Sequence, residues 1–326
     1  MRVWRSLDDV AADLGRSVAT VGNFDGVHLG HRHVVARARE VADQLGVDSV
    51  VAVTFDPHPI AVLRPEHAPV MLSSIEQRVE LLGAAGVDDV LVLPFSREIA
   101  QWSPERFVVD VLVDKLHVAG VVVGANFRFG SRAAGDVATL RELGEQHGFT
   151  AEGIPLDGGP QVWSSTYVRM CLAGGDVEGA AEALGRPVTV RGTVRRGDAR
   201  GHELGYPTAN IATGSTAAPA DGVYAGWLRI VADGDGTPLP AAVSVGTNPT
   251  FAGERERRVE AYVLDRDDLE LYDREVEVVF VKRLRGMVRF DGVDALLEAM
   301  ADDVQRTREL LRVGEGAGEG AGEGTA

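Results

Sequence analysis

The stretch GNFDGVHLGH, residues 22–31, decides the fold of the first half of this chain. It follows an apolar run at 18–21 that has the pattern of a buried strand. It leads into an apolar stripe at helical spacing, formed by Val34, Val35, Ala38, Val41 and Leu45. Glycines between a strand and a helix start suit a phosphate group, because they let backbone N–H groups approach an anion and the helix start adds a partial positive charge. His28 and His31 can then hydrogen-bond one phosphoryl group from the same side.

The length and composition indicate an ordinary globular protein with two domains. The chain has 326 residues, of which 45% are hydrophobic and 25% charged, and this length exceeds a usual single core. Its net charge of −16 argues against a general nucleic-acid binder but allows a small anion in a locally positive pocket. The single cysteine, Cys171, excludes an intrachain disulfide framework and a cysteine-cluster metal site. With no apolar run of membrane-spanning length and no signal peptide at the start, we expect a cytoplasmic enzyme.

Short apolar runs alternate with helical stretches up to about residue 185. The runs 48–55, 89–95 and 118–124 are bounded by Gly, Pro or Asp, as strands buried on both faces are. Helical stretches at 75–84 and 104–116 lie between them. This alternation predicts a parallel sheet with right-handed crossovers, in which ligands bind beyond the carboxyl ends of the strands. Three motifs lie there: GNFDGVHLGH, TFDPHP at 54–59 and GANFRFG at 124–130.

A change of pattern predicts a domain boundary between residues 186 and 187. A short helix carrying Arg169 is expected after Ser164-Ser165-Thr166, and a second helix at 177–184 should end at Gly185, with Pro187 just beyond. The predicted domains are therefore 1–186 and 187–312, followed by an acidic Gly/Glu/Ala tail, 313–326, that we expect to be disordered.

The sequence pattern of the second domain predicts a small antiparallel barrel. Short strands with turn signals are expected at 189–194, 222–231, 241–245, 258–264 and 276–281. A helix should follow and pack on the barrel, because its apolar residues recur at helical spacing: Val293, Leu296, Leu297, Met300, Val304 and Leu311.

The residues around the first loop fit the transfer of an AMP group. Such a reaction needs hydrogen-bond donors around the α-phosphate and little covalent chemistry from the protein. His28 and His31 would be the catalytic donors, and loop residues with later polar side chains would bind ATP and its phosphates: Gly22, Asn23, Phe24, Asp25, Gly26, Asn126, Arg128, Ser165, Thr166 and Arg169. A histidine pair could also bind a metal, but no carboxylate cluster accompanies this one. His58, between two prolines, fits a rigid turn better than a catalyst.

The motifs GNFDGVHLGH, TFDPHP, GANFRFG and SSTYVR resemble those of the FMN adenylyltransferase module of bacterial bifunctional riboflavin kinase/FAD synthetases. That module belongs to the nucleotidyltransferase superfamily with the His-x-Gly-His signature. The resemblance implies that His28 and His31 stabilise the α-phosphoryl transition state, and it assigns ATP contacts to Asn126, Ser165, Thr166 and Arg169. The family's last motif usually begins with Ile, where this chain has Trp163, but the contact residues are intact.

The stretch 192–211, GTVRRGDARGHELGYPTANI, is rich in glycine, but the chain has no Walker loop, which argues against a P-loop kinase. A phosphoryl-transfer site still needs an anion cradle, a Mg²⁺ ligand and a base for the acceptor hydroxyl. Thr208 offers a hydroxyl to Mg²⁺, and Asn210 lies on the same side if the segment is extended. The segment 207–210 could equally be only a turn. Backbone amides could meet phosphates at three glycines: Gly197, Gly201 and Gly205.

Glu260 is the candidate base. It lies on the polar face of an alternating run, 258–263, although that pattern alone favours an ordinary solvated strand face. The motifs GHELGYPTANI, DGVYAG, SVGTNPTF and VEAYVLD resemble the riboflavin kinase module in the same order. The resemblance implies that Thr208 and Asn210 bind Mg²⁺-ATP and that Glu260 takes the proton from the ribityl 5′-hydroxyl. Residues 246–251 would shape the flavin pocket; His202, where many relatives carry Arg or Lys, is left out of the site.

Together the two resemblances cover almost the whole chain except the tail. They imply a Rossmann-like nucleotidyltransferase domain with a parallel sheet, then a riboflavin kinase-like β-barrel with a terminal helix. The enzyme would phosphorylate riboflavin to FMN with ATP and adenylylate FMN to FAD, releasing pyrophosphate and using Mg²⁺ in both steps. Its partners would be riboflavin, FMN, FAD and ATP, with no nucleic acid and no membrane. The alternatives are a nucleotidyltransferase for another phosphorylated acceptor with an inert barrel, and a flavin- or nucleotide-sensing module whose barrel binds RNA, against which the acidic balance counts.

Overall fold

The chain forms two compact units in a computed structural model that describes residues 1–155, 163–196, 206–231, 236–247, 257–266 and 268–312. The first unit comprises residues 1–167 with 183–185, and the second comprises 168–182 with the chain from 186 onward. The predicted tail, 313–326, and the predicted positions Gly197, Gly201, His202 and Gly205 lie outside the described residues. The boundary between residues 186 and 187 stays a prediction.

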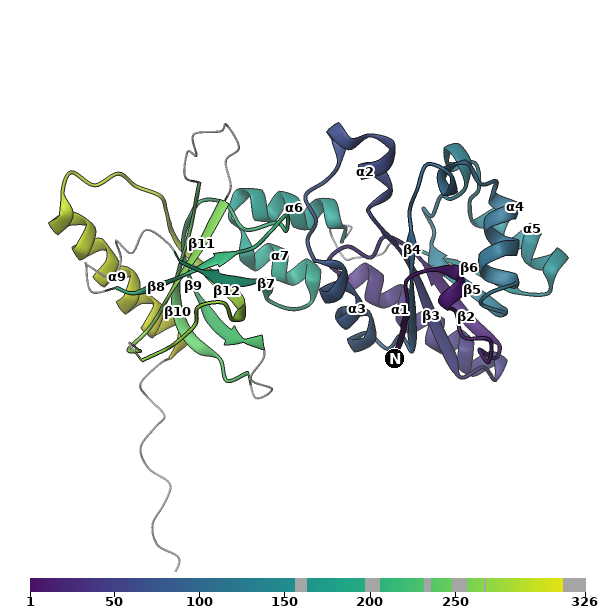
Figure 1. The fold of residues 1–326 in the computed structure, drawn as a ribbon, viewed down its shortest axis with the longest axis horizontal. Helices are drawn as coiled ribbons and strands as arrows, with labels where there is room; N and C mark the ends of the chain where they lie inside the picture. Colours follow the sequence, from purple (N-terminus) through teal and green to yellow (C-terminus); the bar gives the residue numbers. More distant parts are fainter. Residues whose placement is uncertain (156–162, 197–205, 232–235, 248–256, 267, 313–326) are drawn as a thin grey trace, which may run out of the picture. The chain divides into compact units, whose positions relative to one another are not determined.

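A six-stranded sheet in the order β1-β4-β3-β2-β5-β6 forms the centre of the first unit (Figure 1). Every neighbouring pair is parallel, as predicted. The strands are β1 (Arg2–Trp4), β2 (Ser17–Val21), β3 (Ser49–Asp56), β4 (Asp89–Pro94), β5 (Val118–Gly124) and β6 (Thr150–Ile154). The helices are α1 (Leu29–Leu45), α2 (Pro59–Leu63), α3 (Ile75–Ala84), α4 (Pro104–Phe107), which continues as a π-helix over Val108–Val113, and α5 (Val137–His147).

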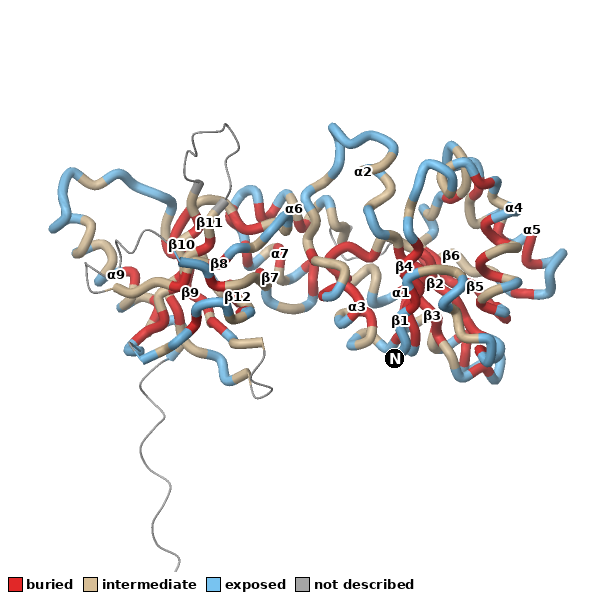
Figure 2. Tube along the Cα trace, viewed as in Figure 1, coloured by how far each residue is buried: buried red, intermediate tan, exposed pale blue. Residues whose placement is uncertain are grey.

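Helices cover both faces of this sheet, which explains the continuous apolar runs of its central strands. On one face Val18, Val50 and Val90 pack in one buried cluster with residues of α1 and α3. On the other face, Val51 and Leu91 pack in a second cluster with residues of α4, the π-helix and α5. The central strands are accordingly buried along their length (Figure 2).

The strand order places the predicted motifs at one point of the sheet. From β2 the chain moves outward to β3 and β4, and then crosses to β5 on the other side of β2. The loops that follow β2 and β5 therefore flank the point where the strand order reverses, which is where open α/β sheets bind ligands. These loops carry GNFDGVHLGH and GANFRFG.

The second unit is built on a closed barrel in the order β10-β11-β8-β7-β12-β9, and all of its pairings are antiparallel. The fold class is thereby confirmed, although β8 was not among the predicted strands. The strands are β7 (Val188–Arg195), β8 (Thr208–Ala212), β9 (Gly222–Ile230), β10 (Leu239–Thr247), β11 (Arg257–Val263) and β12 (Glu275–Gly286). The helices are α6 (Ser165–Gly174), whose first residues belong to the first unit, α7 (Val177–Leu184) and α9 (Val293–Leu311).

Helix α9 packs on the outside of β9 and β10, as predicted. The predicted apolar positions are only half-buried or exposed, and the two fully buried residues of the helix are Asp303 and Thr307. Asp303 forms a bidentate ion pair with Arg285 of β12, at 2.7 to 3.1 Å. The helix is therefore held by a buried charge pair as well as by apolar contact. In the described part of the chain, no helix has both the length and the apolar content needed to cross a membrane.

Candidate active sites

The loop after β2 has a backbone shape that ordinary residues rarely adopt. Phe24, Gly26 and Val27 have φ angles of +48°, +77° and +40°. Positive φ at the β-branched Val27 is strained, and the loop holds this shape because Phe24 and Val27 are 2% and 1% exposed. Left-handed residues of this kind occur in backbone turns that bind anions through successive N–H groups.

Asp25 anchors this loop from below. Its carboxylate, 1% exposed, accepts hydrogen bonds from the backbone N–H groups of Leu72 at 3.0 Å and Ser73 at 3.2 Å. The hydroxyl of Ser73 in turn accepts a bond from Gly26 N. The hydroxyl of Ser165, at the start of α6, donates to the carbonyl of Asp25 at 2.9 Å. The structure thus brings Ser165 to the loop.

His28 and His31 form a stacked pair at the start of α1. Their ring centroids are 3.6 Å apart with the planes 25° from parallel, and the edge of Phe24 lies against His31 at 5.1 Å. Gly30 leaves room for the stack, because a Cβ there would lie 3.1 Å from Cε1 of His28, a tight contact that would push on the ring. Burial, followed by the neighbouring charges of His28 and Arg78, holds the pKa of His31 well below its usual value. His31 is therefore neutral at pH 7, with one N–H to donate.

Two residues to which the sequence assigned no role lie behind this loop: Arg78, and Thr54 of the TFDPHP motif. Arg78 of α3 is 3% exposed, and its Nη1 donates to Thr54 Oγ1 at 3.3 Å and to the carbonyl of Phe55 at 3.1 Å. Thr54 in turn donates to the carbonyl of Asn23 at 3.0 Å. One signal could have found Arg78, since it interrupts the apolar face of its helix next to Val79.

A large cavity opens above the carboxyl ends of β2, β3 and β5. Its volume is about 1030 Å³, and Gly22, Asn23 and Asn126 are among its lining residues. Asn126 is exposed, and Arg128 pairs with Asp136 at 2.7 Å. Aromatic side chains dominate the wall: Phe55, Phe95, Trp102, Phe107, Phe127 and Phe129. The cavity therefore suits a flat aromatic ring system with a polar tail.

The remaining predicted residues of the first site lie on helices α6 and α2. Thr166 is exposed on the first turn of α6. Arg169 lies one turn after Ser165 on the same helix, in the part that belongs to the second unit. His58 caps α2 by accepting a bond from Ile60 N at 3.2 Å, which is the behaviour of a turn residue. Among the described residues, no three His, Cys, Asp or Glu side chains gather into a metal-binding group.

On the barrel, the strand register places the three predicted kinase residues on one face. Glu260 of β11 lies directly opposite Asn210 of β8, and Thr208 lies opposite Tyr262. Neighbouring Ala209 and Ala261 are buried, while all four polar residues are partly exposed, so the polar set lies on the outer face. Directly opposed residues in an antiparallel pair have Cβ atoms about 5 Å apart. Glu260 thus lies next to Asn210, whose side-chain amide carries an oxygen.

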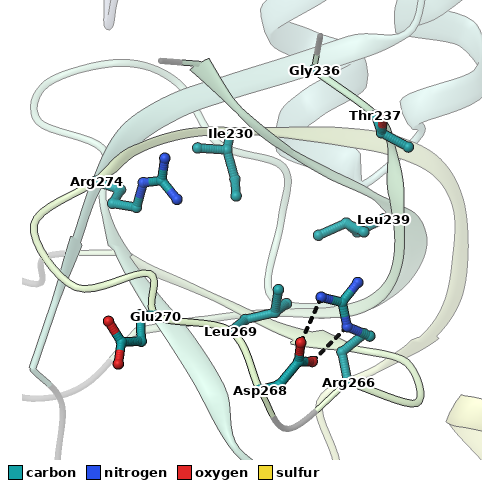
Figure 3. A pocket seen from close by; sticks show the side chains of 9 residues that line it. All are labelled: Ile230, Gly236, Thr237, Leu239, Arg266, Asp268, Leu269, Glu270 and Arg274. Atoms are coloured by element: carbon teal, nitrogen blue, oxygen red, sulfur yellow. Dashed lines mark hydrogen bonds and ion pairs between the residues drawn. The ribbon is translucent and has the colours of Figure 1, made fainter. Parts of the chain in front are cut away.

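The barrel end at which β8 begins is hollowed. A cavity of about 100 Å³ is lined by Thr208 and Tyr272. It shares Arg266 and Leu269 with a larger cavity of about 570 Å³, shown in Figure 3. In this larger cavity Arg266 is paired with Asp268 at 2.6 Å. The cavity next to Thr208 and the larger cavity therefore share part of their walls.

Exposed apolar side chains lie near the end of β10. Gly246 of β10 pairs with Arg258, two residues before Glu260 on β11. A Cβ at Gly246 would lie 3.8 Å from Cε of Met287. Met287 and the next residue, Val288, are 54% and 58% exposed. On β10, Ser244 lies opposite Glu260, and Met287 lies near Gly246, two residues further along that strand.

Comparison with known proteins covers both units. A family model described as FAD synthetase matches residues 10–166, and one described as riboflavin kinase matches residues 184–311. A bifunctional riboflavin kinase/FMN adenylyltransferase of Pseudomonas fluorescens is 39% identical over 95% of this chain and 98% of its own length. The protein of that name in Escherichia coli (strain K12) is 36% identical, over 90% and 92%. A solved structure named macrolide-efflux protein, from Streptococcus pneumoniae, has a TM-score of 0.84 at 30% identity, over 94% of this chain and 98% of its own.

Proposed function

Because the chain belongs to the family of bifunctional riboflavin kinase/FMN adenylyltransferases, we propose that its two units divide the two reactions between them. The chain is an ATP-dependent enzyme that converts riboflavin to FMN and FMN to FAD, as the sequence motifs implied. We assign adenylyl transfer to the loop and cavity of the first unit, and phosphorylation to the outer face of the barrel. This assignment rests on the strand register, which sets Glu260 opposite Asn210. Both residues lie far along the chain from the histidine pair.

In adenylyl transfer, a phosphate oxygen of FMN attacks the α-phosphorus of ATP, and the bond to the leaving pyrophosphate breaks. His28 and His31 donate their N–H groups to the non-bridging α-phosphate oxygens, whose charge grows in the transition state. The start of α1 adds its partial positive charge. The loop residues 22–26 position the phosphates, and further ATP contacts come from Asn126, Ser165, Thr166 and Arg169. The isoalloxazine ring of FMN occupies the aromatic cavity.

In phosphorylation, Glu260 takes the proton from the ribityl 5′-hydroxyl as the oxygen attacks the γ-phosphorus of ATP, and ADP leaves. The donor set fits Mg²⁺, because a hydroxyl and an amide oxygen lie on one strand face beside a carboxylate. Thr208 and Asn210 would hold Mg²⁺, which when bound neutralises charge on the ATP phosphates. The exposed apolar side chains of Met287 and Val288 receive the flavin ring. Gly197 and Gly205 remain proposed phosphate contacts outside the described residues.

Consumption of ATP in both steps supports a cytoplasmic location, which we propose for the enzyme. The match of the barrel to riboflavin kinase counts against an inert second domain.

Two pairs of variants test the division of labour. FMN formation is measured with riboflavin and ATP, and FAD formation with supplied FMN and ATP. We expect His31→Ala to lower FAD formation by about a hundredfold or more and to leave FMN formation intact, whereas the exposed neighbour His33→Ala changes neither. We expect Glu260→Gln to lower FMN formation by about a hundredfold or more and to leave FAD formation intact, with the exposed Glu275→Gln as its control. Loss of both activities in a folded His31 or Glu260 variant contradicts the two-site proposal.

A further inference from the structure

Arg78 is a buried cation that the proposed chemistry leaves without a role. Only 3% of the residue is exposed, and its helix, α3, carries none of the motifs that identify the adenylyl-transfer site. Burying a guanidinium is costly unless its environment compensates it. The free-energy cost of burying this guanidinium indicates that Arg78 has a function.

The contacts of Arg78 connect three elements behind the nucleotide loop. Its Nη1 donates to the hydroxyl of Thr54 and to the carbonyl of Phe55, at the carboxyl end of β3. Thr54 then donates to the carbonyl of Asn23, in the loop after β2. The chain of hydrogen bonds thus runs from α3 through β3 into the loop that precedes His28.

The same guanidinium acts electrostatically on His31. Its charge and that of His28, after burial itself, disfavour the protonated imidazole and lower the pKa of His31. Asp25, the carboxylate of this loop, accepts hydrogen bonds from the backbone of residues 72–73. Arg32 and His33, which follow on α1, are exposed. Of the groups that lower the pKa of His31, Arg78 is the permanently charged one, and it lies on a different helix, α3.

We propose that Arg78 is a positioning residue for adenylyl transfer, which fixes the nucleotide loop against β3 and maintains a buried positive charge behind His31. The inference rests on the proposed role of His31. When the negative phosphates of ATP approach, they favour protonation of the imidazoles, and the charge of Arg78 opposes it. His31 then enters the reaction in the neutral form, with its single N–H directed by the stack with His28.

Three substitutions separate charge from hydrogen bonding. Arg78→Lys keeps the charge, Arg78→Gln keeps an N–H donor without charge, and Arg78→Met removes both. The exposed Arg16→Met serves as the matched control. The kcat/KM for FAD formation from FMN is measured between pH 5 and 9, and the imidazole of His31 is titrated by NMR. FMN formation by the same preparations reports on folding of the other unit.

We expect Arg78→Gln and Arg78→Met to lower kcat/KM for FAD formation by about tenfold or more and to move the acid limb of the profile to higher pH. The sign follows because removal of a like charge raises the pKa of His31. Arg78→Lys should keep the limb in place, and FMN formation should not change in any variant. If Arg78→Met does not fold, the Gln and Lys pair still decides the question.

Two results overturn the inference. One is a wild-type rate and pH profile in Arg78→Gln, and the other is a loss of rate with no movement of either the acid limb or the NMR titration of His31, which leaves only a packing role. Failure of the proposed function is recognised separately, because His31→Ala would then retain FAD formation.

Discussion

The ion pair between Arg285 and Asp303 makes the strongest stability prediction. Three contacts of 2.7 to 3.1 Å join the two side chains, which are 22% and 5% exposed. Removing one partner of a buried pair costs about 3–5 kcal/mol. Because Arg285 keeps part of its surface in water, we expect Asp303→Asn to lower the free energy of unfolding of the barrel by about 3 kcal/mol. For a domain of this size, that corresponds to a loss of roughly 10 °C in Tm.

The effect should also reach the proposed riboflavin site. The guanidinium of Arg285 lies 5.5 Å from the ring centre of Phe290, in the segment that follows Met287. An unpaired Arg285 no longer fixes this segment, so the KM for riboflavin should rise in Asp303→Asn while FAD formation from supplied FMN stays unchanged.

The assay is thermal unfolding of the full chain, followed together with both activities. Asp302→Asn is the matched control, because Asp302 is exposed and its contact with Arg306 is 3.7 Å, a surface pair worth about 0–1 kcal/mol. The double variant Arg285→Met/Asp303→Leu should recover most of the lost stability, because no buried charge is left unpaired. The reasoning is refuted if Asp303→Asn and Asp302→Asn melt alike, or if the double variant is less stable than Asp303→Asn.

Two further predictions concern the first unit. Gly30→Ala should lower FAD formation about tenfold without loss of stability, because the new Cβ displaces the ring of His28 while alanine favours the helix. The control is Gly15→Ala, where a Cβ would have nothing within 4 Å, and it should change neither FAD formation nor urea unfolding. Equal activity of the two variants would count against a role for the stacked histidine pair. Burial raises the pKa of Asp89, but hydrogen bonds from Arg2 outweigh it, so the net pKa is lowered from 3.8. The pair therefore stabilises the fold above pH 3.8, and the difference in unfolding free energy between wild type and Arg2→Met should shrink as the pH falls below that value. A difference that stays constant between acid and neutral urea titrations would contradict this assignment.

The fold of the first unit could be predicted largely because its signals are local. The strand Val118–Gly124 and the helix Ile75–Ala84 appear where their apolar patterns placed them. The three-residue β1 escaped prediction because so short a run carries no periodicity, and its place is set by pairing with β4. Strand β8 escaped for a related reason, since its alternation is recognisable only once β7 and β11 flank it.

The two candidate sites also differ in how far local sequence signals could predict them. The histidine pair is visible in the sequence because a helix turn brings residues three positions apart together. Its anchors are not, because Thr54 and Arg78 reach the loop through hydrogen bonds between separate elements. For the barrel, alternation at 258–263 equally described a solvated strand face, and only the pairing with β8 put Asn210 opposite Glu260.

Because of this difference, the two proposed sites would be disrupted by different structural changes. A one-residue slip between β8 and β11 would turn Asn210 and Thr208 into the barrel interior and separate them from Glu260. The proposed kinase site therefore exists only while the closed barrel fixes its register. The proposed adenylyl-transfer site instead depends on a strained loop whose shape is maintained by buried polar contacts from β3 and from residues 72–73, just before α3. Such contacts can be weakened singly, which is why substitutions behind the loop should tune the rate and pH dependence of FAD formation without unfolding the sheet.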